Sequence, residues 1–263
     1  MSKINQAFAD GKAFIAFLTA GDPSAGKTVD YILEMEAAGA DLVEIGIPFS
    51  DPTAEGVVIQ DANIRALAAG MTTDGVFDIV RRVREKSNIP LVFLTYLNPV
   101  FHYGYERFFM TCRETGVDGI IIPDLPYEEK GELAEIAAKH EVDVISMIAP
   151  TSRQRIQTIA KDAGGFIYIV SSMGVTGMRQ AITTDLKSIV DVVREETDTP
   201  VAIGFGINKP GQAGQMAEIA DGVIVGSAIV KIIEEYGAEA GTYLRKYVTE
   251  MKQAVLRADE MGK

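Results

Sequence analysis

The sequence is poor in the residues that build disulfides and metal sites. It has one cysteine and two histidines among 263 residues. Because a single cysteine cannot form an intrachain disulfide, Cys112 is expected to pack in a helix as a half-buried small hydrophobe. His140 ends a predicted helix and His102 stands alone in a loop, so neither has the spacing of a metal ligand. A metal site is not expected.

Basic charge and long apolar runs are also scarce. Lysine and arginine number 25 against 37 aspartates and glutamates, which gives a formal net charge of −12. This balance, without a basic cluster, argues against binding to nucleic acid or to an anionic membrane. No stretch approaches the roughly 20 uncharged apolar residues that cross a bilayer, and residues 1–10 lack the apolar centre of a secretory signal. We therefore expect a cytoplasmic protein.

The remaining composition, 47% hydrophobic and 24% charged, is that of a globular chain. Its length suits one α/β barrel domain, which takes about 250 residues. Short apolar runs rich in β-branched residues alternate with longer segments of helical period, the pattern of βαβ units. The runs predicted as strands are Ala13 to Thr19, Asp41 to Gly46, Pro90 to Tyr96, Gly119 to Ile122, Asp143 to Ile148, Phe166 to Val170, Pro200 to Gly204 and Gly222 to Val225.

Helix starts and breaks support the same alternation. Short polar residues that cap helices stand before or at the start of helical segments, namely Ser24, Thr73 and Ser152. Residues 1–10 add a possible first helix, and residues 228–261 form a long helical tail with expected breaks near Gly237 and Gly241. We predict a single-domain (β/α)₈ TIM barrel over residues 1–263, with an extra N-terminal helix. An open doubly wound sheet is the alternative.

Barrel enzymes carry their chemistry where the strands end, at the carboxyl side of the barrel. No lysine ends a predicted strand, which argues against Schiff-base catalysis. Glycines follow the last three strands, at residues 174–177, 204–206 and 226–227. Glycine lets backbone amides approach an anion, and a helix beginning after Gly226 and Ser227 adds the positive end of its dipole. These loops predict a phosphate site.

Glu44 stands between apolar neighbours inside a predicted strand. Burial would raise its carboxyl pKa and suit it to general acid–base catalysis. The alternative is a buried acid paired with a hydroxyl or an amide for packing alone. Asp51, Glu55 and Asp124 follow strands and are candidates for a second carboxylate, although turn and cap roles suit the two aspartates equally well. Residue type alone does not choose among the three.

Several segments together resemble the signatures of the tryptophan synthase α subunit. The most specific is residues 44–52, EIGIPFSDP. The others that follow the family's order and spacing are residues 17–23, 96–98, 123–126, 174–177, 204–207 and 226–228. The resemblance covers nearly the whole chain.

The resemblance implies a lyase that cleaves indole-3-glycerol phosphate to indole and glyceraldehyde 3-phosphate in tryptophan biosynthesis. By the same resemblance Glu44 protonates indole C3 and moves the side-chain hydroxyl proton, while Glu55 accepts the indole N–H. The implied pocket residues around the ring and its side chain are Phe17, Tyr96, Tyr168 and, in a loop at residues 173–182 that could close as a lid, Thr176. The implied phosphate cradle is Gly177, Gly204, Phe205, Gly206, Gly226 and Ser227.

The chain departs from the family pattern at two positions, with Glu55 where aspartate is usual and Val57 where proline is usual. The longer arm keeps the charge but changes the geometry of the second carboxylate. The resemblance further implies no cofactor in this subunit and a pyridoxal-phosphate β subunit as partner, in an αββα heterotetramer. The bonds Asp51–Pro52 and Asn98–Pro99 lie in loops that could face that partner.

Two other functions remain open from the sequence. One is a non-catalytic or weakly active subunit that mainly activates the β partner, which the glutamate at position 55 makes worth testing. The other is a different phosphate-binding barrel isomerase or synthase. A lysine or a pair of aspartates at strand ends would favour the second, and neither is found.

Overall fold

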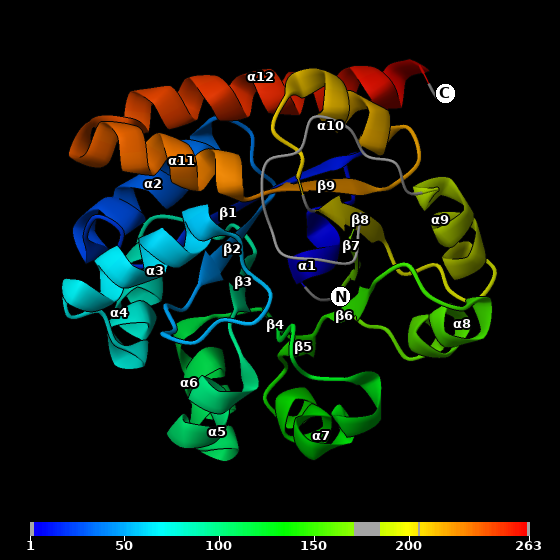
Figure 1. The fold of residues 1–263 in the computed structure, drawn as a ribbon, viewed down its shortest axis with the longest axis horizontal. Coiled ribbons are helices and arrows are strands. Elements are labelled where there is room, and N and C mark those ends of the chain that lie inside the picture. Colours follow the sequence, from blue (N-terminus) through cyan, green and yellow to red (C-terminus); the bar gives the residue numbers. More distant parts are fainter. Residues whose placement is uncertain (1–2, 171–184, 205, 262–263) are drawn as a thin grey trace.

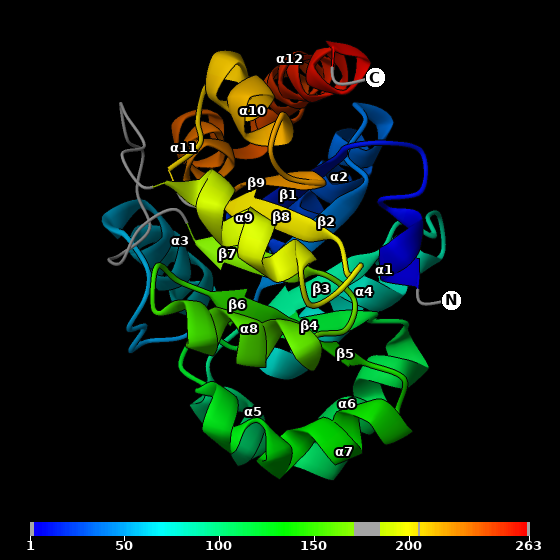
Figure 2. The ribbon, with the colours of Figure 1, turned by 90° about the vertical axis from the view of Figure 1, so that its right-hand side faces the viewer.

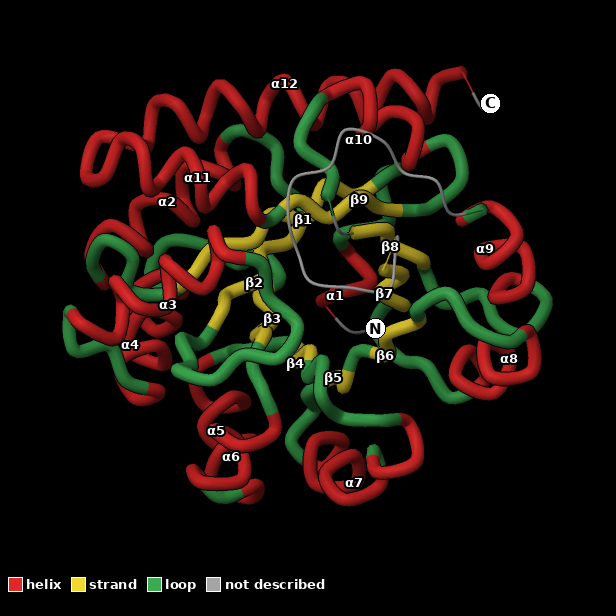
Figure 3. Tube along the Cα trace, in the orientation of Figure 1, coloured by secondary structure: helices red, strands yellow, loops and turns green. Residues whose placement is uncertain are grey.

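The computed structural model describes residues 3–170, 185–204 and 206–261, and its centre is a parallel β barrel (Figures 1 and 3). All strand pairs among these residues are parallel, in the order β5-β4-β3-β2-β1-β9-β8-β7-β6. The strands are β1 (Ala13–Thr19), β2 (Leu42–Gly46), β3 (Leu91–Leu94), β4 (Gly119–Ile121), β5 (Asp143–Val144), β6 (Ser146–Ile148), β7 (Ile167–Val170), β8 (Val201–Gly204) and β9 (Gly222–Val225).

The nine strands form an eight-stranded barrel because β5 and β6 are two parts of one strand. Only Ile145 separates them, and its backbone N–H still donates to the Ile120 carbonyl oxygen at 2.9 Å. β5 pairs with β4 while β6 pairs with β7, so the two ends of the sheet meet on either side of Ile145. The predicted barrel is confirmed, and the open sheet is not adopted.

The helices lie around the outside of the barrel except for the first, which lies at one end of it, as the views from two directions show (Figures 1 and 2). They are α1 (Lys3–Gln6), α2 (Ala25–Ala37), α3 (Val57–Ala68), α4 (Thr73–Arg84), α5 (Leu97–Tyr103), α6 (Tyr105–Thr115), α7 (Gly131–Lys139), α8 (Arg153–Lys161), α9 (Leu186–Arg194), α10 (Pro210–Ala217), α11 (Ser227–Tyr236) and α12 (Ala240–Met261), with short 3₁₀ turns η1 (Tyr127–Glu129) and η2 (Gly237–Glu239). Ser24 and Ser152 cap α2 and α8 as expected, each accepting from the backbone N–H three residues later, whereas Thr72 rather than Thr73 caps α4. None of the helices in these ranges is both long and apolar enough to cross a membrane.

Every residue of β1 is buried because one side of the strand faces the helices and the other faces the barrel interior. Phe14, Ala16 and Leu18 join the outer core beneath the helices, whereas Ala13 and Ile15 join the inner core. Ile4 of α1 belongs to the inner core and lies against Gly119 of β4. These side chains fill the barrel interior near its N-terminal end, and a pocket opens toward the carboxyl ends of the strands.

Predicted strand bounds agree with the structure to within one or two residues, and β1 and β9 match at both ends. Several details differ. His102 and the Asn98–Pro99 bond, which were expected in loops, lie inside α5. The helical tail is interrupted at Gly237, but Gly241 lies inside α12, where helix packing overrides its low helix propensity. The fifth strand is broken at Ile145 rather than continuous. Cys112 is fully rather than half buried, because α6 turns it toward the outer core.

Candidate active site

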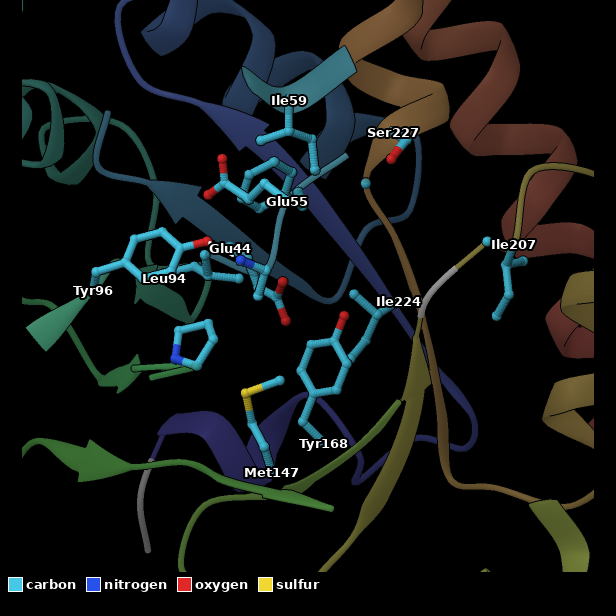
Figure 4. A pocket seen from close by; sticks show the side chains of 15 residues that line it. Glu44, Glu55, Ile59, Leu94, Tyr96, Met147, Tyr168, Ile207, Ile224 and Ser227 are labelled. Carbon is cyan, nitrogen blue, oxygen red and sulfur yellow. Dashed lines mark hydrogen bonds between the residues drawn. The ribbon is translucent and has the colours of Figure 1, made fainter. Parts of the chain in front are cut away.

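One pocket opens at the carboxyl ends of the strands and gathers side chains from most of the barrel (Figure 4). Its lining comes from β1, β2, β3, β6, β7 and β9, from α3, and from the segments after β2, β3, β4, β8 and β9. The lining residues are Phe17, Glu44, Ala54, Glu55, Ile59, Leu94, Tyr96, Pro123, Met147, Tyr168, Gly206, Ile207, Ile224, Gly226 and Ser227. The surface is mostly apolar, with two carboxylates and two phenols, and suits a flat aromatic ligand that carries polar groups.

Glu44 projects into this pocket from the middle of β2. Its neighbours Val43 and Ile45 point outward into the core beneath the helices, so the alternation of the strand turns Glu44 inward. The side chain is 1% exposed, and its Oε1 has no hydrogen-bond partner among the described residues. Loss of hydration raises the pKa of the Glu44 carboxyl to about 8. Glu44 is therefore mostly protonated near neutral pH and can give up a proton.

Glu55 reaches the same pocket from the segment between β2 and α3. It is 7% exposed, and the side chain of Asn63 donates to its Oε2 at 2.6 Å. Burial raises the pKa of the Glu55 carboxyl to about 7, while the hydrogen bonds from Asn63 and Tyr96 act in the opposite direction. These donors favour the ionised form, so Glu55 is the more acidic of the two carboxyl groups.

Tyr96 connects the carboxylate of Glu55 to the backbone beside it. The Tyr96 hydroxyl oxygen accepts from the N–H of Ala54 at 3.2 Å, and its own proton is donated to Glu55. Burial and the nearby Glu55 raise the pKa of Tyr96, so its phenol stays protonated. The amide of Gln60 also donates to the backbone carbonyl oxygen of Glu55 at 2.7 Å. The segment that carries the second carboxylate is thus held from both sides.

Glycines at two strand ends make room for aromatic rings. A Cβ on Gly46 would lie 2.8 Å from the ring of Phe17, and a Cβ on Gly204 would overlap the hydroxyl of Tyr168. Gly204 lies behind Tyr168 and does not line the pocket. Gly206 adopts a φ of +85°, which favours glycine, and lines the pocket together with Gly226 and Ser227. Because α11 begins at Ser227, its positive N-terminal end faces this part of the pocket.

Most of the sequence-predicted residues meet in this pocket, namely Phe17, Glu44, Glu55, Tyr96, Tyr168, Gly206, Gly226 and Ser227. Thr176, Gly177 and Phe205 lie outside the described residues. The two aspartates that competed with Glu55 do not line the pocket: Asp51 accepts from the Ser50 hydroxyl, and Asp124 accepts from the backbone N–H of Leu97 at 2.9 Å.

Sequence reasoning missed Asn63 and the apolar wall of the pocket. Leu94 and Met147 could have been found from alternation. Leu94 lies two residues before Tyr96, which lines the pocket, and Met147 lies two residues after Ile145 of the inner core. Asn63 carries a weaker signal, a single amide on the buried face of α3 between Ala62 and Ala66. Nothing in residue type alone connects it to Glu55.

A family model described as "Tryptophan synthase alpha chain" matches residues 4–258. The chain belongs to this family. Tryptophan synthase alpha chains from Lactiplantibacillus plantarum and Lacticaseibacillus casei are 51% and 49% identical to it, and the matches cover 97% of this chain and 97% and 96% of those proteins. The crystal structure of the alpha chain from Legionella pneumophila superposes with a TM-score of 0.88 at 36% identity, covering 98% of each chain.

A second solved structure, from Pyrococcus furiosus, is of an a2b2 tryptophan synthase complex. It superposes with a TM-score of 0.85 at 37% identity, covering 92% of this chain and 99% of that one. The predicted family and reaction are confirmed: the family cleaves indole-3-glycerol phosphate in tryptophan biosynthesis, and the chain is a lyase. Neither a purely activating subunit nor another barrel isomerase or synthase is favoured by these matches.

Proposed function

We propose that Glu44 and Glu55 divide the chemistry of indole-3-glycerol phosphate cleavage between them. The observation that carries this assignment is their joint burial in one pocket, with pKa values of about 8 for Glu44 and about 7 for Glu55. Between pH 7 and 8 the Glu44 carboxyl is mostly protonated, whereas half or more of the Glu55 carboxyl is ionised. Two neighbouring carboxyl groups can act as an acid and as an anionic stabiliser when their surroundings give them different pKa values.

Glu44 acts as the acid and then as the base. Its proton is transferred to indole C3, which places a positive charge on the ring and its nitrogen. The Glu44 carboxylate then accepts the proton of the side-chain hydroxyl next to C3. As that O–H bond breaks, a carbonyl forms, the bond from C3 to the side chain breaks, and its electrons return to the ring. Indole and glyceraldehyde 3-phosphate result, and Glu44 is protonated again.

Glu55 stabilises the charge that develops on the ring. Its carboxylate accepts the indole N–H, and this interaction strengthens when C3 is protonated because the nitrogen becomes more positive. Phe17, Tyr96 and Tyr168 border the ring and its side chain. The polar groups of the Glu55 segment therefore act at the transition state more than on the bound substrate.

The glycerol phosphate end is held where glycines line the pocket. Gly206, Gly226 and Ser227 line one part of it, and α11 begins there. Backbone N–H groups and the helix dipole bind a phosphate without bulk positive charge, which suits a chain of net charge −12. We include Gly177 and Phe205 in this cradle, and Thr176 with the substrate, on the family resemblance alone, and leave out Gly204 because it lies behind Tyr168.

The partner is a tryptophan synthase β subunit in an αββα assembly, and pyridoxal phosphate belongs to that subunit. The complex from Pyrococcus furiosus supports such an assembly. Exposed apolar side chains occur on the helices that follow β2 and β3, with Val57 of α3 71% exposed and Phe101 of α5 69% exposed. A partner that covers these side chains would remove apolar surface from water.

The test follows indole release from indole-3-glycerol phosphate by its fluorescence, with the chain alone and with a tryptophan synthase β subunit. The chain has no tryptophan, so its own emission does not mask the signal. Release that disappears in Glu44→Gln and rises with the β subunit is expected. Release that persists in Glu44→Gln at the wild-type rate would remove Glu44 from the mechanism. A rate unchanged by β would contradict the proposed partnership.

A further inference from the structure

The amide of Asn63 makes a short, buried contact with a catalytic carboxylate. Asn63 is 4% exposed, and its Nδ2 lies 2.6 Å from Oε2 of Glu55. It lies on the buried face of α3 with Ile59, Ala62 and Ala66, and is eight residues beyond Glu55 in the chain. Because α3 packs against β1 and α11, Asn63 is part of the rigid barrel shell, whereas Glu55 precedes the helix.

The contact completes a clamp on the Glu55 side chain. Tyr96, the residue before α5, donates to the carboxylate, and Gln60 donates to the backbone carbonyl oxygen of Glu55. A glutamate side chain has three rotatable bonds, and the two donors restrict all of them at once. A carboxylate has about four lone-pair positions, so these two bonds leave acceptor capacity for a ligand N–H.

We propose that Asn63 is a positioning residue for the lyase reaction, which holds the Glu55 carboxylate in the orientation that accepts the indole N–H. The inference rests on the role proposed for Glu55 and extends it to a residue that does not line the substrate pocket. An amide suits this position because it donates a hydrogen bond at every pH and adds no charge. It also stabilises the ionised form of Glu55, which accepts the N–H more strongly than the neutral acid does.

The experiment compares Asn63→Ala, Asn63→Asp and Gln60→Ala with the wild type, as the complex with its β subunit. For each, kcat/KM for indole-3-glycerol phosphate is measured across the pH range around neutrality. In Asn63→Ala we expect kcat/KM to fall about tenfold at neutral pH, because the carboxylate is less well placed. The acidic limb of the profile should also move upward by about one pH unit, because the ionised form loses a hydrogen bond.

The other two variants distinguish a role of Asn63 in positioning the Glu55 carboxylate from a general loss of structure around it. Asn63→Asp keeps the size of the side chain but puts a second acid beside Glu55, so its acidic limb should move further upward than that of Asn63→Ala. Gln60→Ala should leave the acidic limb in place, because Gln60 donates to the backbone carbonyl rather than to the carboxylate. If Asn63→Ala does not fold, the nearly isosteric Asn63→Asp carries the test.

Wild-type rates and a wild-type acidic limb in both Asn63 variants would overturn the inference. A uniform loss of kcat/KM with no movement of the limb would also overturn it, because that is the signature of a structural role alone. Glu55→Gln, measured in the same series, keeps the two proposals apart. Full activity in Glu55→Gln removes the role of Glu55 itself, whereas a loss there with unaffected Asn63 variants removes only the role of Asn63.

Discussion

The two pocket carboxylates belong to one βα unit but are held in different ways. Glu44 lies within β2, paired in register with Phe17 of β1 and Val92 of β3, so the backbone ladder on both sides sets its position. Glu55 lies nine residues after the end of β2 and depends on side-chain hydrogen bonds from Asn63 and Tyr96. Burial raises the pKa of Glu44, and no hydrogen bond to its Oε1 from the described residues offsets this effect. Glu55 has the lower pKa because Asn63 and Tyr96 donate hydrogen bonds to its carboxylate.

Of the substitutions that distinguish the two carboxyl groups, removal of the Glu44 carboxyl should have the largest effect on activity. Glu44→Gln keeps the shape of the side chain and removes the only proton donor proposed for C3. Indole release should fall by roughly a thousandfold or more, within the range that acid–base catalysis contributes. Single-turnover measurement of indole formation tests this, and a reduction of only a few-fold would contradict the acid–base role.

The same substitution should change how stability depends on pH. In the unfolded chain a glutamate ionises near 4.5, whereas in the folded chain Glu44 ionises near 8. Between these values the unfolded state binds fewer protons, so the free energy of unfolding falls as pH rises. Relative to Glu44→Gln, the wild type should lose on the order of 5 kcal/mol across this interval, or about three thousandfold in the unfolding constant.

Urea denaturation of both chains over this pH interval provides the measurement. Glu55 and the other titrating groups are present in both chains, so their contributions cancel in the difference. Parallel stability curves would show that Glu44 ionises in the folded protein at the pH of an ordinary glutamate.

Loss of the loop carboxylate should cost less. Glu55→Gln removes the charge that faces the developing cation, but leaves the proton donor and an amide oxygen near the ring nitrogen. A reduction of about a hundredfold in kcat is expected, comparable to the removal of one preorganised electrostatic group. Steady-state kinetics that determine kcat and KM separately test this prediction. An increase in KM alone would indicate that Glu55 contributes to substrate binding rather than to transition-state stabilisation.

The pH dependence of kcat/KM compares the two carboxyl groups in the wild-type chain, without any substitution. Activity requires Glu55 ionised and Glu44 protonated, so kcat/KM should rise with pH up to about 7 and fall above about 8. Outside this narrow maximum the rate should change about tenfold per pH unit. In Glu55→Gln the acidic limb should disappear while the alkaline limb stays. A flat profile in the wild type would contradict the paired assignment.

Much of the barrel could be predicted because its strands are short apolar runs between polar turns. This pattern can be recognised from residues that are consecutive in the sequence. Glu44 was predictable for the same reason, as an acid in a strand with apolar neighbours. The break at Ile145 could not be predicted, because it depends on pairing with two other strands. Residues before Ile145 pair with β4, and residues after it pair with β7. Likewise, the break expected at Gly241 failed because the packing of α12 on α2 and α10 outweighs a local preference.

The sequence by itself determined the alternation of strands and helices, the position of Glu44, the glycines at the last strand ends and the resemblance that named the family. It left Asp51, Glu55 and Asp124 as equal candidates when judged by residue type. Only the tertiary structure separated them, since Ala54 and Tyr96, which fix the Glu55 segment, are 42 residues apart in sequence. Desolvation and hydrogen bonding are properties of neighbours in space, so the pKa values of the two carboxyl groups and the clamp by Asn63 follow from the folded chain alone.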